Sequence, residues 1–93
     1  MAILSAAAVE EKLKSLQDWK HEGSEIVRRV EFSNFVEAID FVNHVAEKAE
    51  SAGHHPDIDI RYNKVRLALV SHDAGGLTQR DFDLASAIDA LLR

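Results

Sequence analysis

Residues 57–72, DIDIRYNKVRLALVSH, decide the fold because they predict a β-hairpin. Apolar residues alternate with charged or small residues from 57 to 62 and again from 65 to 70, which is the period of a strand with one buried face. Asn63 and Lys64 separate the two runs, and Asn tolerates the positive φ that a two-residue hairpin loop requires. The stretch therefore predicts two antiparallel strands joined by an Asn63-Lys64 loop.

This loop sets the register of the hairpin. Three apolar pairs follow from it: Tyr62 with Val65, Ile60 with Leu67, and Ile58 with Leu69. All three pairs lie on one face, and a slip by one residue would separate them, so the register is self-consistent. Continued to the open end of the hairpin, the same register places His55 opposite His72, where facing Cβ atoms lie roughly 4.5–5.5 Å apart. His54 is the neighbouring residue, so the hairpin predicts a cluster of three histidines.

A long helix precedes the hairpin. Apolar residues recur at helical spacing over Phe35–Ala52, Asn34 is a suitable N-cap, and Gly53 is the residue type that commonly follows a helix. Pro56 prevents the helix from resuming. We therefore expect the helix to end just before the histidine pair.

Two further helices flank these elements. Ser5 caps a first helix that runs to about Leu16. Thr78 caps a last helix, and Asp81 stands at the spacing of a capping box. Both segments carry an apolar stripe at helical spacing, so each is expected to pack on a core.

Two strands lie between the first helix and the long one. Gly23-Ser24 forms the turn between Asp18–Glu22 and Glu25–Phe32. The alternation of the second strand breaks at Val27 and Arg28, which indicates either a bulge or a partly covered outer face. The order is then αββαββα in one domain spanning residues 1–93, which predicts an α+β layer of helices on an antiparallel sheet.

The composition limits the classes of function. The chain has 93 residues with 11 basic and 16 acidic side chains, a net charge of −5 and no cysteine. A nucleic-acid surface needs clustered lysine and arginine, which argues against that partner. The lack of cysteine excludes disulfides, thiolate zinc sites and thiol nucleophiles. No apolar stretch reaches the ~20 residues of a membrane helix, and the start of the chain lacks the basic residues of a secretory signal, so we expect a soluble cytoplasmic domain.

Two carboxylates accompany the predicted histidine cluster. Glu50 lies four residues before His54, in the last turn of the long helix, and Asp81 lies shortly after His72. Imidazole exchanges protons near neutral pH, and a carboxylate can orient it. The cluster of His54, His55 and His72 therefore predicts acid–base chemistry.

Each of these residues also has a structural interpretation. A zinc site is the less favoured alternative, because adjacent side chains in an extended segment point to opposite sides. Taken alone, Asp81 is a helix cap and Glu50 is a solvated helix residue. Arg80 is either a solvated charge or an anchor for a polar ligand. Trp19 is more often part of a core than a platform for a ligand.

Two other sets of charged or titratable side chains have no predicted role in the site. His21 and His44 lack evident partners and are expected on the surface. Arg61 and Arg66 are predicted to face each other across the hairpin, an unfavourable pair for which Asp59 is a diagonal neighbour.

Five stretches of the chain combine into one pattern: Glu50-Ser-Ala-Gly-His54-His55-Pro56, Tyr62-Asn63-Lys64-Val65, Leu69-Val70-Ser71-His72-Asp73, Gly75-Gly76-Leu77-Thr78 and Arg80-Asp81. This pattern resembles that of the pterin-4a-carbinolamine dehydratase family, over roughly Leu16 to Leu92. Three departures bear on the shape of the pterin pocket. No aromatic residue follows Pro56 closely, Ser71 replaces the usual threonine, and Asp18 replaces a common glycine.

The resemblance implies an enzyme that dehydrates a 4a-hydroxytetrahydropterin to the quinonoid dihydropterin in tetrahydrobiopterin recycling, with no cofactor. It implies principal acid–base roles for His54 and His72 and a pterin-placing role for His55. The residues that would orient the histidines or bind the substrate are Glu50, Arg80, Asp81 and Trp19. It also implies a four-stranded antiparallel sheet with helices packed on one face, assembled into a homodimer or homotetramer.

A function of another class is implied by some relatives of this pattern, which bind the dimerisation segment of a homeodomain transcription factor through their helical surface. The wide apolar stripe of Phe35–Ala52 suits either self-association or such a partner. Loss of His72 would abolish an enzyme and leave an interaction module intact. A third alternative is the same chemistry on a different pterin.

Overall fold

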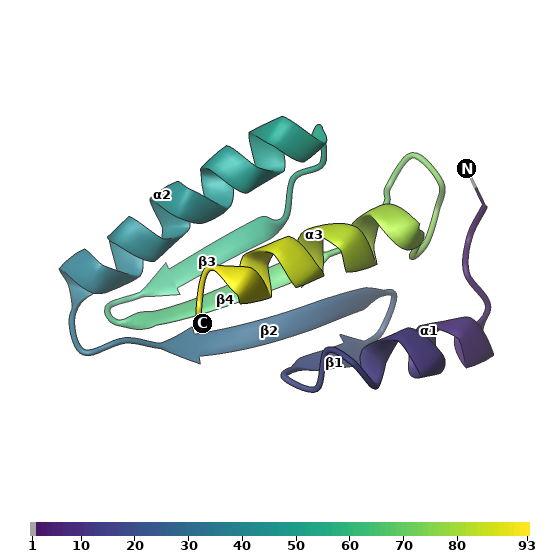
Figure 1. The fold of residues 1–93 in the computed structure, drawn as a ribbon, viewed down its shortest axis with the longest axis horizontal. Helices are drawn as coiled ribbons and strands as arrows, with labels where there is room; N and C mark the ends of the chain where they lie inside the picture. The colour runs from purple at the N-terminus through teal and green to yellow at the C-terminus, as the bar shows by residue number, and fades with distance from the viewer. Residues whose placement is uncertain (1) are drawn as a thin grey trace.

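The computed structural model describes residues 2–93, and its elements follow the predicted order αββαββα (Figure 1). Their bounds are α1 Ala6–Leu13, β1 Trp19–Glu22, β2 Glu25–Glu31, α2 Phe35–Ala52, β3 Asp57–Arg61, β4 Lys64–Leu69 and α3 Gln79–Ala90. Across residues 2–93, no helix is both long enough and apolar enough to cross a bilayer.

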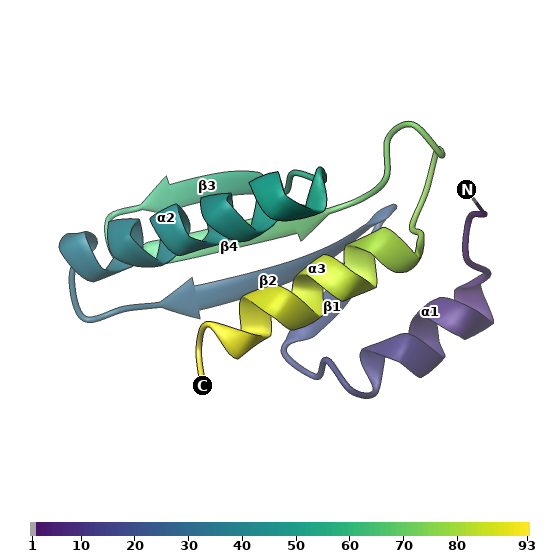
Figure 2. The ribbon, with the colours of Figure 1, turned by 45° about the horizontal axis from the view of Figure 1, so that its top comes forward.

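A four-stranded antiparallel sheet forms one layer of the molecule, with its strands in the order β1-β2-β4-β3. Figures 1 and 2 show α2 and α3 over the same face of this sheet, while α1 lies beside the β1 end. The predicted α+β architecture is therefore confirmed. The central position of β4 matters for the site, because the segment that follows β4 leads directly into α3.

The core lies between the sheet and these two helices. The sheet contributes Ile26, Leu67 and Leu69, which belong to one buried cluster with Val45 of α2 and Ile88 of α3. Full burial of one such side chain stabilises the fold by roughly 1.5–3 kcal/mol. This packing holds α2 and α3 at fixed positions on the sheet, and both helices carry residues of the predicted site.

The capping residues of α2 act as the sequence predicts. Asn34 Oδ1 accepts a hydrogen bond from Glu37 N at 2.9 Å, and Gly53 ends the helix in the left-handed conformation with a φ of 61°. Only glycine adopts that conformation without strain from a Cβ atom. The chain therefore turns sharply at Gly53, and the histidine pair begins one residue later.

The hairpin register differs from the prediction by two residues. Ile60 pairs with Val65 and Ile58 with Leu67, and the loop is Tyr62-Asn63 rather than Asn63-Lys64. Since side chains alternate with a period of two, a two-residue shift leaves every residue on its predicted face, and the alternation alone could not tell the registers apart.

Contacts outside the hairpin hold the observed loop in place. Asn63 Nδ2 donates to the carbonyl of Phe32 at 2.7 Å, and Phe32 N donates to the carbonyl of Asn63 at 2.9 Å. Tyr62 takes the left-handed conformation, with a φ of 54°. The loop is thereby tied to the end of β2, and this tie is invisible in the pattern of the hairpin itself.

The irregularity in β2 is explained by cover on its outer face. The register of β2 is continuous with both neighbouring strands, so there is no bulge. Val27 is fully buried beside Ala68 on the outer face, and Arg28 turns inward to bond Asp89 of α3.

The first helix also differs slightly from the prediction. It ends at Leu13 instead of about Leu16.

Candidate functional site

His54 lies between the end of α2 and the start of α3. Its backbone N–H donates to the carbonyl of Ala49 at 3.1 Å, which continues the turn made by Gly53. The residue is only 8% exposed, and its Nε2 lies 2.5 Å from Oδ1 of Asp81. A buried imidazole held against a carboxylate is the arrangement that orients a histidine for proton transfer.

Asp81 is completely buried in the first turn of α3. Its Oδ2 atom accepts from Ser71 Oγ and from Thr78 N, each at 2.9 Å. The second contact is the reciprocal half of a capping box, so Asp81 acts as a cap and binds His54 at the same time. Asp81 is therefore both a cap of α3 and the hydrogen-bond partner of His54.

His55 points to a different place from His54. Its Nε2 lies 2.5 Å from Oε2 of Glu50, and both side chains are exposed. The two adjacent side chains reach carboxylates on different elements, that of His54 on α3 and that of His55 on α2. The two neighbouring histidines thus each have a carboxylate partner, one buried and one in solvent.

The predicted pairing of His55 with His72 is wrong. β3 begins at Asp57 and β4 ends at Leu69, so both histidines lie beyond the ladder, and the observed register would not set them opposite each other. His72 is exposed in the turn that begins after Ser71, which pairs with Gly76. Among the hydrogen bonds found in residues 2–93, none joins His72 to another histidine. His72 is linked to His54 only through the chain, as the neighbour of Ser71, which bonds Asp81.

Arg80 contributes a charged edge to the site. Its guanidinium donates to Asp73 Oδ1 at 2.6 Å, and this contact holds the pKa of Asp73 below its usual value. Arg80 and His54 also line one hollow of about 330 Å³ between α2 and α3. The other residues that line this hollow are Lys48, Ser51, Ala52, Asp83, Leu84 and Ala87.

Four polar residues around His54 had no role predicted from the sequence: Ser71, Lys48, Ser51 and Asp83. The helical spacing from Lys48 to Ser51 and from Arg80 to Asp83 placed each pair on one helix face. That the two faces meet follows only from the packing of α2 on α3.

Trp19 lies outside this group. The residue is 2% exposed, and its indole Nε1 donates to Asp89 Oδ1 at 2.8 Å. Asp89 is eight residues beyond Asp81 on α3, which corresponds to ~12 Å along the helix axis at 1.5 Å per residue. The structure therefore assigns Trp19 to the core and does not bring it to the histidines.

The remaining two histidines lie on the surface, as predicted. His21 is exposed on β1, and His44 is exposed on α2, with its Nδ1 2.7 Å from the carbonyl of Asp40. In residues 2–93, no group of three histidine or acidic side chains is arranged to hold a metal ion.

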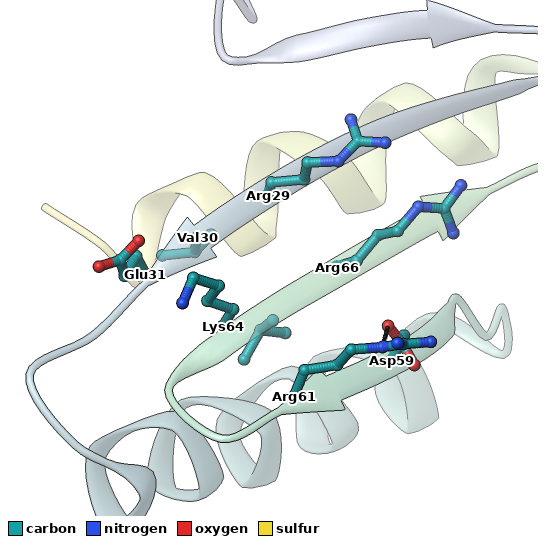
Figure 3. A pocket seen from close by; sticks show the side chains of 8 residues that line it. Arg29, Val30, Glu31, Asp59, Arg61, Lys64 and Arg66 are labelled. Carbon is teal, nitrogen blue, oxygen red and sulfur yellow. Dashed lines mark hydrogen bonds and ion pairs between the residues drawn. The ribbon is translucent and has the colours of Figure 1, made fainter.

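A larger hollow, of about 420 Å³, lies on the sheet (Figure 3). The predicted opposition of Arg61 and Arg66 is wrong, because Arg66 stands opposite Asp59, and Arg61 donates to Asp59 at 3.1 Å. Arg29, on β2, is held by Glu22, whose pKa is lowered mainly by that hydrogen bond. This hollow contains no histidine, so the candidate site remains at the corner between α2 and α3.

Comparison with known sequences identifies one family. The family model described as pterin 4 alpha carbinolamine dehydratase matches residues 2–91. A protein of Acidobacterium capsulatum, provisionally named pterin-4-alpha-carbinolamine dehydratase, is 71% identical over 92 residues, which span 99% of this chain and 100% of the relative. A protein of Chloroflexus aurantiacus with the same provisional name is 60% identical over 92 residues, which span 99% of each chain.

Solved structures share the fold. A protein of Brucella melitensis described as a transcriptional coactivator/pterin dehydratase is similar with a TM-score of 0.92 and 29% identity, over 97% of this chain and 98% of that one. A pterin dehydratase-like protein described as a RuBisCO assembly factor in the alpha-carboxysome gives a TM-score of 0.64 at 22% identity, over 78% of this chain and 84% of that one. At that identity the second likeness concerns the fold alone.

Proposed function

The chain belongs to the pterin 4 alpha carbinolamine dehydratase family, and from that premise we propose that it dehydrates a 4a-hydroxytetrahydropterin by histidine acid–base catalysis, as a step in tetrahydrobiopterin recycling. The family name specifies a hydro-lyase acting on a pterin carbinolamine. The histidine mechanism and the place in recycling are the parts that we add. We also propose that the reaction takes place in the cytoplasm.

The reaction needs one acid and one base. The acid protonates the 4a-hydroxyl group, the C4a–O bond breaks, and the oxygen leaves as water. The base removes the proton from N5, whose electron pair forms the N5=C4a double bond of the quinonoid dihydropterin. Imidazole serves in either role near neutral pH, so two histidines are sufficient for this elimination.

The buried contact between His54 and Asp81 is the observation that carries the proposal. The partially exposed edge of His54 borders the hollow that Arg80 also lines, so a ligand in that hollow would meet an oriented imidazole and a cation. In this proposal His54 and His72 exchange the protons, and Asp81 orients His54. Arg80 binds a polar edge of the substrate.

The solvent-exposed pair contributes to binding in this proposal. His55 places the pterin, and Glu50 orients His55 through the 2.5 Å contact. Trp19 has no part in the proposed site, because its ring is buried and its N–H is bonded to Asp89.

The direct test is the decay of freshly generated 4a-hydroxytetrahydropterin, followed by its ultraviolet absorbance with and without the protein. The variants are His54→Gln, His72→Ala and, as a matched control, His44→Ala, which removes an exposed histidine of α2 that lies outside the site. We expect the wild type and the control to accelerate the decay. Both site variants should lose at least about 10-fold of the acceleration, since one proton-transfer group typically contributes ~10²–10⁴-fold.

One outcome would contradict this function, and another would contradict only the role of His72. A wild type that leaves the spontaneous rate unchanged would remove the dehydratase proposal for this pterin. A wild type that is active together with an equally active His72→Ala variant would keep the reaction and exclude His72 from the proton transfers.

We also propose that the chain forms a homodimer or homotetramer. Phe35 and Val36 at the start of α2 are 49% and 66% exposed, and Ile58 and Tyr62 are exposed on and beside the edge strand β3. A small domain gains stability when a second copy covers such side chains. Light scattering after gel filtration should show dissociation in Val36→Glu but not in Ala7→Glu, which adds the same charge to α1.

An interaction module is the second candidate function. It rests on the description of the Brucella melitensis protein, which joins a coactivator to a dehydratase, and on the same exposed Phe35 and Val36. In that case Val36→Glu would abolish binding of the partner while dehydration persisted. His72→Ala would have the opposite effect.

A further inference from the structure

Two buried hydroxyl groups stand behind the pair formed by His54 and Asp81. Ser71 and Thr78 are both fully buried, one just after β4 and the other at the N-cap of α3. Ser71 Oγ lies 2.9 Å from Asp81 Oδ2 and 2.8 Å from Thr78 Oγ1. The four side chains therefore form one continuous hydrogen-bonded chain in the order Thr78, Ser71, Asp81, His54.

The direction of each hydrogen bond in this chain follows from the number of protons available. Asp81 Oδ2 accepts from both Ser71 Oγ and Thr78 N, which is the pattern of a carboxylate, so Asp81 Oδ1 also accepts and the ring nitrogen of His54 is the donor. Ser71 has a single hydroxyl proton, and Asp81 Oδ2 takes it. At the contact between the two hydroxyl groups, Thr78 is then the donor and Ser71 the acceptor.

From this arrangement we propose that Ser71 is a positioning residue, which fixes the proton of neutral His54 on Nε2 and leaves Nδ1 as the nitrogen that exchanges a proton with the substrate. Thr78 assists by donating a hydrogen bond to Ser71 Oγ, which keeps the Ser71 hydroxyl from rotating away from Asp81. This inference rests on the proposed function for the role of Nδ1, and on geometry alone for the position of the proton. The charged groups around the ring, besides Asp81, are Lys48, Arg80 and Asp83, which line the same hollow.

Removal of the Ser71 hydroxyl changes the acceptor. Without it, Oδ2 of Asp81 keeps one donor, the backbone N–H of Thr78, instead of two, so the carboxylate is held less firmly. The direction of the contact with His54 is then less strictly fixed, and the ring can also place its proton on Nδ1. Because a hydrogen bond to a charged group contributes more than a neutral one, we expect kcat to fall by about 10-fold, with KM changed by less than about 2-fold.

The test is nitrogen-15 NMR of histidine-labelled protein, recorded at a pH above the last pH-dependent change in the His54 signals, which are assigned by their loss in His54→Gln. In the wild type, Nε2 should show a protonated, pyrrole-type shift and Nδ1 an unprotonated, pyridine-type shift. Ser71→Ala should show averaged shifts at both nitrogens. Ser71→Thr keeps the hydroxyl and should restore the wild-type pattern. Ser86→Ala, at an exposed serine of α3 that does not line this hollow, is the matched control and should leave the His54 signals unchanged.

Each result decides the matter. A pyrrole-type Nδ1 in the wild type would overturn the proposal even if Ser71→Ala failed to fold, and so would an unchanged His54 spectrum in a folded Ser71→Ala variant. If the wild type had the expected tautomer and lost it in Ser71→Ala, but showed no dehydratase activity, the positioning role of Ser71 would stand and the proposed reaction would fail.

Discussion

The two histidine–carboxylate contacts have the same length, 2.5 Å, and we predict that their removal will have very different effects on stability. Asp81 is completely buried, whereas Glu50 and His55 are exposed. Asp81→Ala and Glu50→Ala each delete one carboxylate from α2 or α3. The comparison therefore tests whether contact length alone determines the effect of removing such a carboxylate.

The loss of stability expected for Asp81→Ala follows from the hydrogen-bond donors that lose their acceptor. The N–H of Thr78 and the Nε2–H of His54 both lose their acceptor, while Ser71 can still turn toward Thr78. An unsatisfied buried donor costs roughly 1–3 kcal/mol, so the two together reduce the free energy of unfolding by about 2–6 kcal/mol. A domain of this kind has about 5–15 kcal/mol in total, so the loss is a large fraction of it.

The assay is urea unfolding followed by circular dichroism. With a slope near 1 kcal/mol per molar of urea, the low end for small proteins, the midpoint of Asp81→Ala should fall by about 2 M or more. The midpoint of Glu50→Ala should match that of the wild type, because an exposed ion pair contributes little. Equal midpoints for the two variants would refute the reasoning, since the shared contact length would then be what matters.

Three further predictions concern the surroundings of the site. Asp89→Ala should lower the free energy of unfolding by about 3 kcal/mol, because it leaves the buried indole N–H of Trp19 without its acceptor and the largely buried guanidinium of Arg28 with only its 3.5 Å contact to Asp18. The nitrogen-15 signals of His54 should stay unchanged; urea unfolding and NMR measure the two effects. Tyr62→Asn should raise the melting temperature by a few degrees, because asparagine tolerates the left-handed conformation at a cost lower by up to about 1 kcal/mol; a lower melting temperature would contradict this. The ion pair between Asp73 and Arg80 should be fully formed above the pKa of Asp73 in the unfolded chain, and it should be lost as the pH falls through the lower pKa of the folded state. Carboxyl carbon-13 NMR should show the pKa of Asp73 return toward its usual value in Arg80→Gln.

The elements of the fold were predictable because local signals determine them. The structure gives α2 the predicted bounds, Phe35–Ala52, since Asn34 and Gly53 act at its ends through neighbouring backbone atoms. The end of α1 was predicted three residues too late. A narrow apolar stripe extended the expected helix to Leu16, but that residue reaches the core from a turn.

Contacts between distant segments were the part that sequence could not specify. The predicted cluster depended on a hairpin register that is wrong by two residues, because the link between Asn63 and Phe32 spans 31 residues. The approach of Asp81 to His54 was expected only as part of a group, and its partner Ser71 was not identified. Trp19 is bonded to Asp89, 70 residues away, and nothing near Trp19 in the sequence indicates this.

The double role of Asp81 has a consequence for how members of this family can diverge. A lineage that abandons the reaction still needs a carboxylate to start α3, so selection for folding alone will retain aspartate at this position. The exposed Glu50, His55 and His72 have no comparable task in the interior, and their loss would be nearly free of a folding penalty. The solvent-facing residues, rather than the buried pair, should therefore be the first to drift in a relative that has become a scaffold.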